Sequence, residues 1–193
     1  MVQRARELPG VTAAAVATML PYSDFTNARR ILRAKDVMPT DPKAPDPSAN
    51  ALYTATTPGY FDALGVKLLR GRDFTKEECE QKDARRVAII DEEMAAKLFP
   101  NEEAIGQHIK YTQPPRDGSP NEMEIVGIVS KHLHSVAGDT IIARLFVPLA
   151  QGYSGQIYMH VRLNSLDRTA VTAFIPTLRQ TLRDVDPDLP LLQ

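Results

Sequence analysis

Residues 57–74 of the chain read TPGYFDALGVKLLRGRDF. Thr57-Pro58 offers a helix cap followed by proline, and proline is tolerated at the first helical position, so a short helix is predicted over 59–64. A glycine ends that helix, and an extended segment is predicted over 66–69 before the turn at Gly71-Arg72-Asp73. Helix, strand and turn therefore follow one another within a few residues, which indicates a mixed domain of helices and strands.

Extended segments are predicted along most of the remaining chain, from apolar and β-branched runs bounded by glycine and proline. They cover residues 11–19, 30–34, 52–56, 86–90, 107–111, 122–129, 144–148 and 156–163. Because four of the nine residues over 11–19 are alanine, a helix is the alternative there. The strands over 107–111 and 122–129 are expected to meet across a hairpin loop over 112–121.

Helices are predicted at three further places. Residues 3–8 end a helix that Pro9-Gly10 stops, and Asp91 or its neighbours cap a helix that extends through Phe99. Apolar residues at spacings of three and four predict a last helix with one stripe facing a core. They are Val171, Phe174, Ile175, Leu178, Leu182 and Val185. Pro176 lies inside this helix and is expected to kink it or to mark a late start.

Composition excludes several classes of protein. The 193 residues carry 23 basic and 24 acidic side chains, a net charge of -1 that argues against a nucleic-acid binder, which would have a basic surface. One cysteine cannot form an internal disulfide. No apolar stretch approaches the roughly 20 residues of a membrane span, and the first residues lack the apolar core of a signal peptide.

Two histidines are the best candidates for a metal site. His132 and His134 are two residues apart, so both would point the same way on a strand. They could bind a metal if a third ligand such as His108 or Asp139 converged on them. Exposed polar residues after the preceding strand are the simpler interpretation, so no metal site is predicted.

Other reactive side chains also have simpler interpretations. His160 lies in the middle of a predicted strand and is expected to pack or to form a hydrogen bond. Gly152-Tyr153-Ser154-Gly155 lacks the serine-hydrolase spacing, which places glycines two residues before and two after the serine. Cys79 lies in the charged run 76–80, where carboxylates discourage the thiolate.

Acidic clusters do not match known sites either. Asp91-Glu92-Glu93 is explained by the preference for negative charge at a helix N-terminus. Asp36, Asp41 and Asp46 are spaced by five residues and interleaved with prolines, unlike a calcium loop. The sequence contains neither the phosphate-loop motif nor the dinucleotide-binding glycine motif. It therefore predicts no catalytic residue, no bound cofactor and no metal.

The order and spacing of structural landmarks carry a family resemblance. The landmarks are Leu8-Pro9-Gly10-Val11, Thr57-Pro58-Gly59-Tyr60-Phe61, Leu64-Gly65, Leu68-Leu69, Gly71-Arg72-Asp73-Phe74, Val87-Ala88-Ile89-Ile90-Asp91-Glu92, Ala96, Leu98-Phe99-Pro100, Ile105-Gly106-Gln107, Glu124-Ile125-Val126-Gly127-Ile128-Val129, Phe146-Val147-Pro148 with Gln151, His160-Val161-Arg162 and Asp186-Pro187-Asp188-Leu189-Pro190. Over essentially its whole length the chain resembles the periplasmic core domain of MacB/FtsX-type ABC transporter permeases.

The resemblance implies an α+β fold with two lobes. Residues 1–55 and 155–193 would form a β-α-β porter-like lobe from both chain ends. Residues 56–154 would form an inserted, mostly-β lobe. The proline-rich stretch over 37–50 has almost nothing apolar to bury, and it would be a loop near the junction of the lobes.

The resemblance also implies a mechanical function without chemistry in this domain. Such a domain lies between the first two transmembrane helices of a permease, on the periplasmic face of the bacterial inner membrane. ATP is hydrolysed by a separate cytoplasmic domain or subunit, and the outer domain moves for efflux or for lipoprotein or peptide handling. The implied partners are the permease's transmembrane helices, a second permease copy and the ATP-binding part, with a periplasmic adaptor or the substrate as further candidates. No nucleic acid is implied.

Two departures and two alternatives accompany this interpretation. The chain begins inside the expected first helix and ends about where a strand toward the second membrane helix would begin, so we expect a domain excised from a longer protein, monomeric in isolation. A free-standing periplasmic binding or scaffold protein of the same fold is the first alternative. A hydrolase or metalloenzyme that uses His132 and His134 is the second.

Overall fold

The computed structural model describes residues 1–21, 27–114, 118, 120–131, 143–152, 155–165 and 167–188. Its strands are β1 (Val11–Ala17), β2 (Ala28–Arg33), β3 (Ala49–Thr56), β4 (Leu68–Gly71), β5 (Val87–Asp91), β6 (His108–Tyr111), β7 (Glu122–Val129), β8 (Ala143–Pro148) and β9 (Tyr158–Leu163). Its helices are α1 (Val2–Arg6), α2 (Tyr60–Leu64), α3 (Lys76–Glu80), α4 (Glu92–Leu98), α5 (Leu149–Gly152) and α6 (Arg168–Val185).

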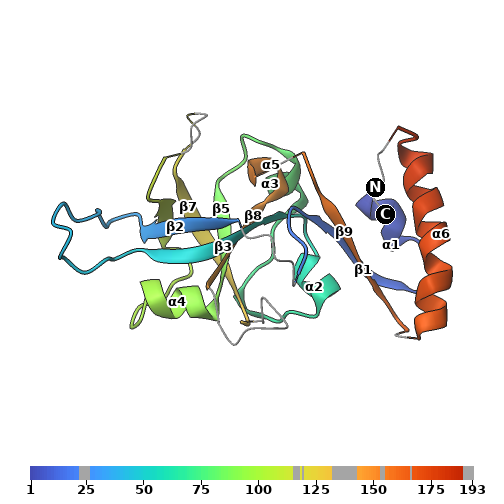
Figure 1. Ribbon diagram of the computed structural model, residues 1–193, viewed down its shortest axis with the longest axis horizontal. Helices are drawn as coiled ribbons and strands as arrows, with labels where there is room; N and C mark the ends of the chain where they lie inside the picture. Colours follow the sequence, from blue (N-terminus) through green and yellow to red (C-terminus); the bar gives the residue numbers. More distant parts are fainter. Residues whose placement is uncertain are drawn as a thin grey trace.

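Six of the strands close on themselves to form a small barrel, in the order β2-β6-β7-β5-β8-β3 with β3 returning to β2. The β3–β8 and β5–β7 pairs are parallel and the other four pairs are antiparallel. Closure leaves the barrel strands without a free edge between them. The barrel occupies the left and centre of Figure 1, and strand β4 is added on the outside of β7.

The barrel interior is an apolar core that α4 covers at one end. Alternate residues of the strands point inward, among them Ile90, Ile125 and Leu145, which are fully buried. Helix α4 follows β5 directly, contacts β3, β5, β7 and β8, and adds Met94 and Leu98 to the same core. One mouth of the barrel is therefore closed by the apolar face of a helix.

The outer face of the barrel carries a second core under α2 and α3. Phe146 of β8 is fully buried there, and the rings of Phe61 and Phe146 meet edge to face with centroids 5.0 Å apart. Tyr60 packs against Phe146 at 6.0 Å and against His160 at 5.2 Å. This cluster joins α2 to the barrel and to β9.

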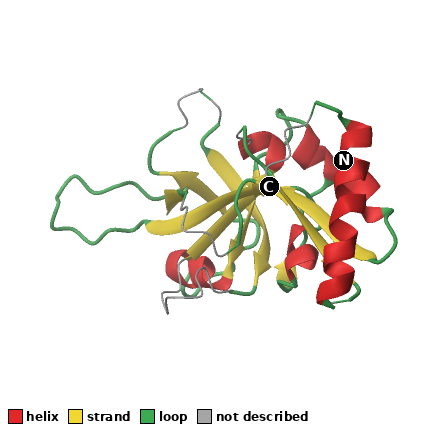
Figure 2. Ribbon diagram, turned by 45° about the vertical axis from the view of Figure 1, so that its right-hand side comes forward, coloured by secondary structure: helices red, strands yellow, loops and turns green. Residues whose placement is uncertain are grey.

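Strands β1 and β9 extend from the barrel and carry α1 and α6 on one side (Figures 1 and 2). The antiparallel β1–β9 ladder runs from Val11↔Leu163 to Ala17↔Tyr158, whereas β1 meets β3 only at Ala17↔Thr56. Helix α1 packs on β1 and beside α6. No helix in the described part of the chain is long and apolar enough to cross a membrane.

Most predicted strands and helices are confirmed, with boundaries shifted by a few residues. The helical alternative over 11–19 is wrong, because β1 occupies it. Thr57 does not cap α2: its Oγ1 accepts a hydrogen bond from the Val16 N–H at 2.9 Å, and the helix begins at Tyr60 after Gly59. Helices α3 and α5 were not predicted, although Thr75 and Glu78 form a capping box that opens α3.

The expected buried stripe of α6 is largely wrong. Leu182 is buried, whereas Val171, Ile175 and Val185 are each about two-fifths exposed. Within the described residues α6 packs chiefly on the short helix α1, which is too small to cover the whole stripe. The helix begins at Arg168 and contains Pro176, so the late start is also wrong.

The proline-rich loop between β2 and β3 projects from the barrel at the end of the molecule opposite α1 and α6 (Figure 1). Its expected place near the junction of the two predicted lobes stays a prediction. The division into lobes at residues 55 and 155 stays a prediction. Strands β2 and β3, assigned to the first lobe, pair with β6 and β8 of the middle region.

Candidate functional site

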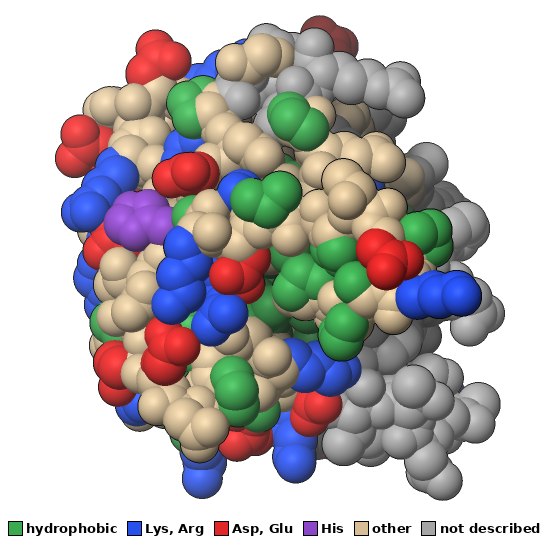
Figure 3. Space-filling model, turned by 90° about the vertical axis from the view of Figure 1, so that its left-hand side faces the viewer, with side chains coloured by type: hydrophobic (Ala, Val, Ile, Leu, Met, Phe, Trp, Pro, Cys, Tyr) green, Lys and Arg blue, Asp and Glu red, His purple; other side chains and the backbone are tan. Residues whose placement is uncertain are grey.

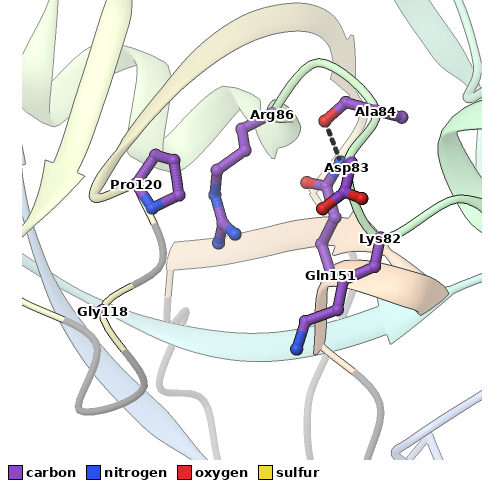
Figure 4. A pocket seen from close by; sticks show the side chains of 7 residues that line it. All are labelled: Lys82, Asp83, Ala84, Arg86, Gly118, Pro120 and Gln151. Atoms are coloured by element: carbon purple, nitrogen blue, oxygen red, sulfur yellow. Dashed lines mark hydrogen bonds between the residues drawn. The ribbon is translucent and has the colours of Figure 1, made fainter.

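In the part of the chain that the structure describes, the second mouth of the barrel is open and polar. Strands β3, β6 and β8 end at this mouth, and β2, β5 and β7 begin there, as the pairing directions require. A cavity of about 300 Å³ lies over it, lined by Lys82, Asp83, Ala84, Arg86, Gly118, Pro120 and Gln151 (Figure 4). The lining thus comes from the turn before β5, the β6–β7 loop and α5.

Gln151 of α5 is held in a fixed orientation. Its Nε2 donates hydrogen bonds to the carbonyl oxygens of Arg85 at 3.0 Å and of Ala84 at 3.4 Å. Because the amide nitrogen is occupied, the orientation of Oε1 is fixed as well. Among the described residues, Oε1 is buried without a hydrogen-bond partner.

Arg86 reaches into the same cavity between Pro120 and Gln151 (Figure 4). Its Nε is buried and has no hydrogen-bond partner in the described part of the chain. Burial raises the pKa of Tyr111, and the positive charge of Arg86 beside the tyrosine offsets part of that rise. Arg86 therefore lies at the polar rim where β6 ends.

Two tyrosines of the barrel core lie beneath this rim. Tyr53 of β3 is buried, and its ring lies 6.4 Å from that of Tyr111. Burial also raises the pKa of Tyr53, with Tyr111 adding to the rise. A Cβ atom at Gly152 would lie 2.0 Å from the Tyr53 hydroxyl oxygen, so glycine there lets α5 approach the tyrosine and carry Gln151 to the mouth.

The predicted metal candidates are not brought together by the described residues. His132, His134 and Asp139 lie outside those residues, and His108 is exposed on β6. No group of three or more His, Cys, Asp or Glu side chains suited to a metal ion occurs in the described part. Ser154 of the rejected serine motif also lies outside it. His160 is buried against Tyr60, as expected, and burial lowers its pKa.

Cys79 lies in α3 and points into the outer core. Its Sγ is 3.3 Å from the Thr56 carbonyl oxygen, to which it donates. Burial raises the pKa of the thiol to about 12, with smaller contributions from Asp73, Glu78 and Glu80. The expected lack of thiolate character therefore has burial as its main cause, ahead of the neighbouring carboxylates.

The acidic residues singled out in the sequence have structural partners. Asp91 caps α4, with Oδ1 accepting from the Met94 N–H at 2.9 Å. Asp36 pairs with Arg33 at 2.7 Å, and Asp46 pairs with Arg30. Figure 3 shows the end of the molecule opposite α6, where basic and acidic side chains are intermixed. The described part of this face shows no concentration of positive charge that would attract a polyanion.

Comparison with known proteins identifies the family. A family model described as the MacB-like periplasmic core domain matches residues 1–177. The chain belongs to this family. The MacB-like domain is 28% identical over 82 residues to the macrolide export ATP-binding/permease protein MacB of Mannheimia succiniciproducens, covering 42% of this chain and 11% of that protein. It thus spans about a tenth of the length of this curated relative.

Solved structures share the fold of the MacB-like domain. The periplasmic region of MacB from Actinobacillus actinomycetemcomitans aligns with a TM-score of 0.60 and 16% identity, over 95% of this chain and 72% of that one. The extracellular domain of the ABC-type transporter YknZ from Gram-positive bacteria aligns with a TM-score of 0.55 and 16% identity, over 89% of this chain and 75% of that one. The predicted α+β class and the family resemblance are confirmed.

Proposed function

We propose that this MacB-like domain is the extracytoplasmic part of an ABC transporter permease subunit. In this role it couples ATP hydrolysis, carried out by a separate cytoplasmic domain or subunit, to movement on the periplasmic side of the inner membrane. Efflux and the handling of lipoproteins or peptides both fit such a role. Membership of the MacB-like family is the observation that carries the proposal.

The packing of the two terminal helices supports a mechanical role. Helix α1 contacts α6, and Arg4 and Glu7 face Thr181 and Asp184 across a hollow of about 290 Å³. Membrane helices placed before α1 and after α6 would thus act on one side of the domain. A displacement of either would reach the β1–β9 ladder directly.

Helix α2 links this side of the domain to the barrel. Arg6 of α1 donates to the Ala14 carbonyl oxygen at 2.9 Å and to the Pro58 carbonyl oxygen at 2.6 Å. Arg162 of β9 donates to the Asp62 carbonyl oxygen of α2 at 2.9 Å. Because α2 also packs on Phe146 of the barrel, contiguous contacts join α1 and β9 to β8. Such a chain of packed elements can carry a displacement.

The first test determines on which side of the membrane the domain lies. The native thiol of Cys79 is buried, so it should add no background labelling. We expect Ala173→Cys, exposed on α6, to react with a membrane-impermeant sulfonated maleimide in intact bacteria that express the full-length gene product. The parent protein, with any cysteine outside these 193 residues replaced by serine, should react only after denaturation, because the Cys79 thiol is buried with its pKa raised to about 12. Labelling of Ala173→Cys only after cell lysis, like a cytoplasmic control protein, would refute an extracytoplasmic location.

A further inference from the structure

The open mouth of the barrel has the features of a small-molecule site. Mouths of β-barrels are common ligand sites, and a volume of about 300 Å³ lies at the lower end of the usual range. The opposite mouth is closed by α4 and its apolar residues. The polar lining of the open mouth is therefore not required by the packing of the barrel core.

Two buried polar atoms on the cavity wall lack partners among the described residues. They are Nε of Arg86, a hydrogen-bond donor, and Oε1 of Gln151, an acceptor. A buried polar group without a partner destabilises a fold, so such groups beside a cavity point to a further molecule that satisfies them. A ligand that enters this cavity and reaches these two atoms would accept from Arg86 and donate to Gln151.

The charges around the cavity define the acceptor. Among the described lining residues, Arg86 and Lys82 are positive and Asp83 is negative, which leaves an excess of one positive charge in that part of the lining. No ion pair joins Lys82 or Asp83 to another described residue. The planar guanidinium matches a carboxylate with two parallel hydrogen bonds, one of which Nε would donate. A carboxylate therefore fits Arg86 better than a neutral carbonyl group does.

We propose that the open barrel mouth binds a ligand with a carboxylate next to an N–H group. The carboxylate pairs with Arg86, Lys82 adds its charge, and the N–H donates to Oε1 of Gln151. A peptide C-terminus and a free N-acylated amino acid or dipeptide share this chemistry. The inference concerns the 193-residue chain alone and does not rest on the proposed transport function.

The test is an NMR titration of the ¹⁵N-labelled 193-residue chain with N-acetyl-glycyl-glycine, its C-terminal amide and acetate. The dipeptide acid should shift the amide signals of residues 82–86 and the Gln151 side chain, and it should bind about tenfold more tightly than the amide or acetate. A hexapeptide ending in Gly-Gly distinguishes a peptide C-terminus from a free small acid as the ligand. If the hexapeptide binds with the same affinity as the dipeptide acid, the site takes peptide C-termini. If the hexapeptide does not bind, the site takes a small free acid.

Matched variants locate the binding. Arg86→Lys keeps the charge but loses the planar donors, so affinity should fall about tenfold. Arg85→Lys is the control, because Arg85 pairs with Glu124 and does not line the cavity. Lys82→Gln changes an exposed position and should weaken binding severalfold. This variant tests the site if Arg86→Lys does not fold. Equal binding of acid and amide, no saturable shift at the mouth, or unchanged affinity in the Arg86 and Lys82 variants would overturn the proposal and leave a water-filled cavity.

Discussion

Replacing Gly71 by alanine should lower the free energy of unfolding by about 3 kcal/mol or more, because a left-handed backbone and a steric clash both oppose the new side chain. Gly71 has φ of +75°, and a Cβ atom there would lie 2.1 Å from the Val126 carbonyl oxygen and 2.9 Å from the Gly127 Cα. Gly71 and Gly127 face each other in the β4–β7 pair. The substitution therefore forces β4 away from the outside of the barrel.

Gly106→Ala is the matched control for this prediction. Gly106 has φ of +80°, but no atom of the described residues lies within 4 Å of the place that its Cβ would take, so only the left-handed backbone should cost stability, about 1–2 kcal/mol. Urea unfolding of the two variants and the parent chain measures the difference. Equal losses in both variants would show that β4 does not approach β7 as closely as described.

The second large effect concerns Asp91 and pH. Asp91 is 1% exposed, and burial raises its pKa to about 6, although hydrogen bonds from Met94 and Arg144 and the charge of Arg144 act in the opposite direction. Glu93 raises the pKa slightly further. The ordinary pKa of an aspartate, expected in the unfolded chain, is 3.8. Between these values the folded chain holds a proton that the unfolded chain has lost, so stability falls as pH rises from about 4 to about 6.

Asp91→Asn should remove this dependence on pH. The asparagine keeps an oxygen that can accept from the Met94 N–H, but it cannot ionise. Relative to the variant, the parent chain should lose about 2 kcal/mol of stability between pH 4 and pH 6.5, because the slope approaches about 1.36 kcal/mol for each pH unit only between the two pKa values. Urea unfolding across that range measures it, with exposed Asp62→Asn as control. A constant difference between the parent and the Asp91 variant would show that Asp91 is not held at a raised pKa.

The strands could be predicted from the sequence because their signals are local. The hydrophobic runs of β5 and β7 and the capping residue of α4 can each be read within a few residues. Closure of the barrel depends on pairs such as β2–β3 and β5–β8, whose registers are set by contacts between distant segments. The exposed stripe of α6 could not be predicted for a similar reason: periodicity predicts an apolar face but does not show what covers it.

The barrel-mouth cavity could not be predicted at all. Arg86 begins a strand and Gln151 follows another, and neither belongs to a motif with fixed spacing. They come together because β5 and β8 are neighbours in the barrel and because Gly152 lets α5 approach Tyr53. In the sequence, Gln151 stands out only as a family landmark, and Arg86 only as the start of a strand. Three-dimensional closure creates this site, so local sequence patterns carry no signal for it.

Movement of this domain on ATP hydrolysis is the central claim, and a distance between two copies tests it most directly. Spin labels on Ala173→Cys in the full-length permease dimer report the separation of the two α6 helices by pulsed electron paramagnetic resonance, with buried Cys79 unlabelled. We expect different distance distributions in the nucleotide-free and vanadate-trapped states. Identical distributions in a sample that hydrolyses ATP would contradict the claim.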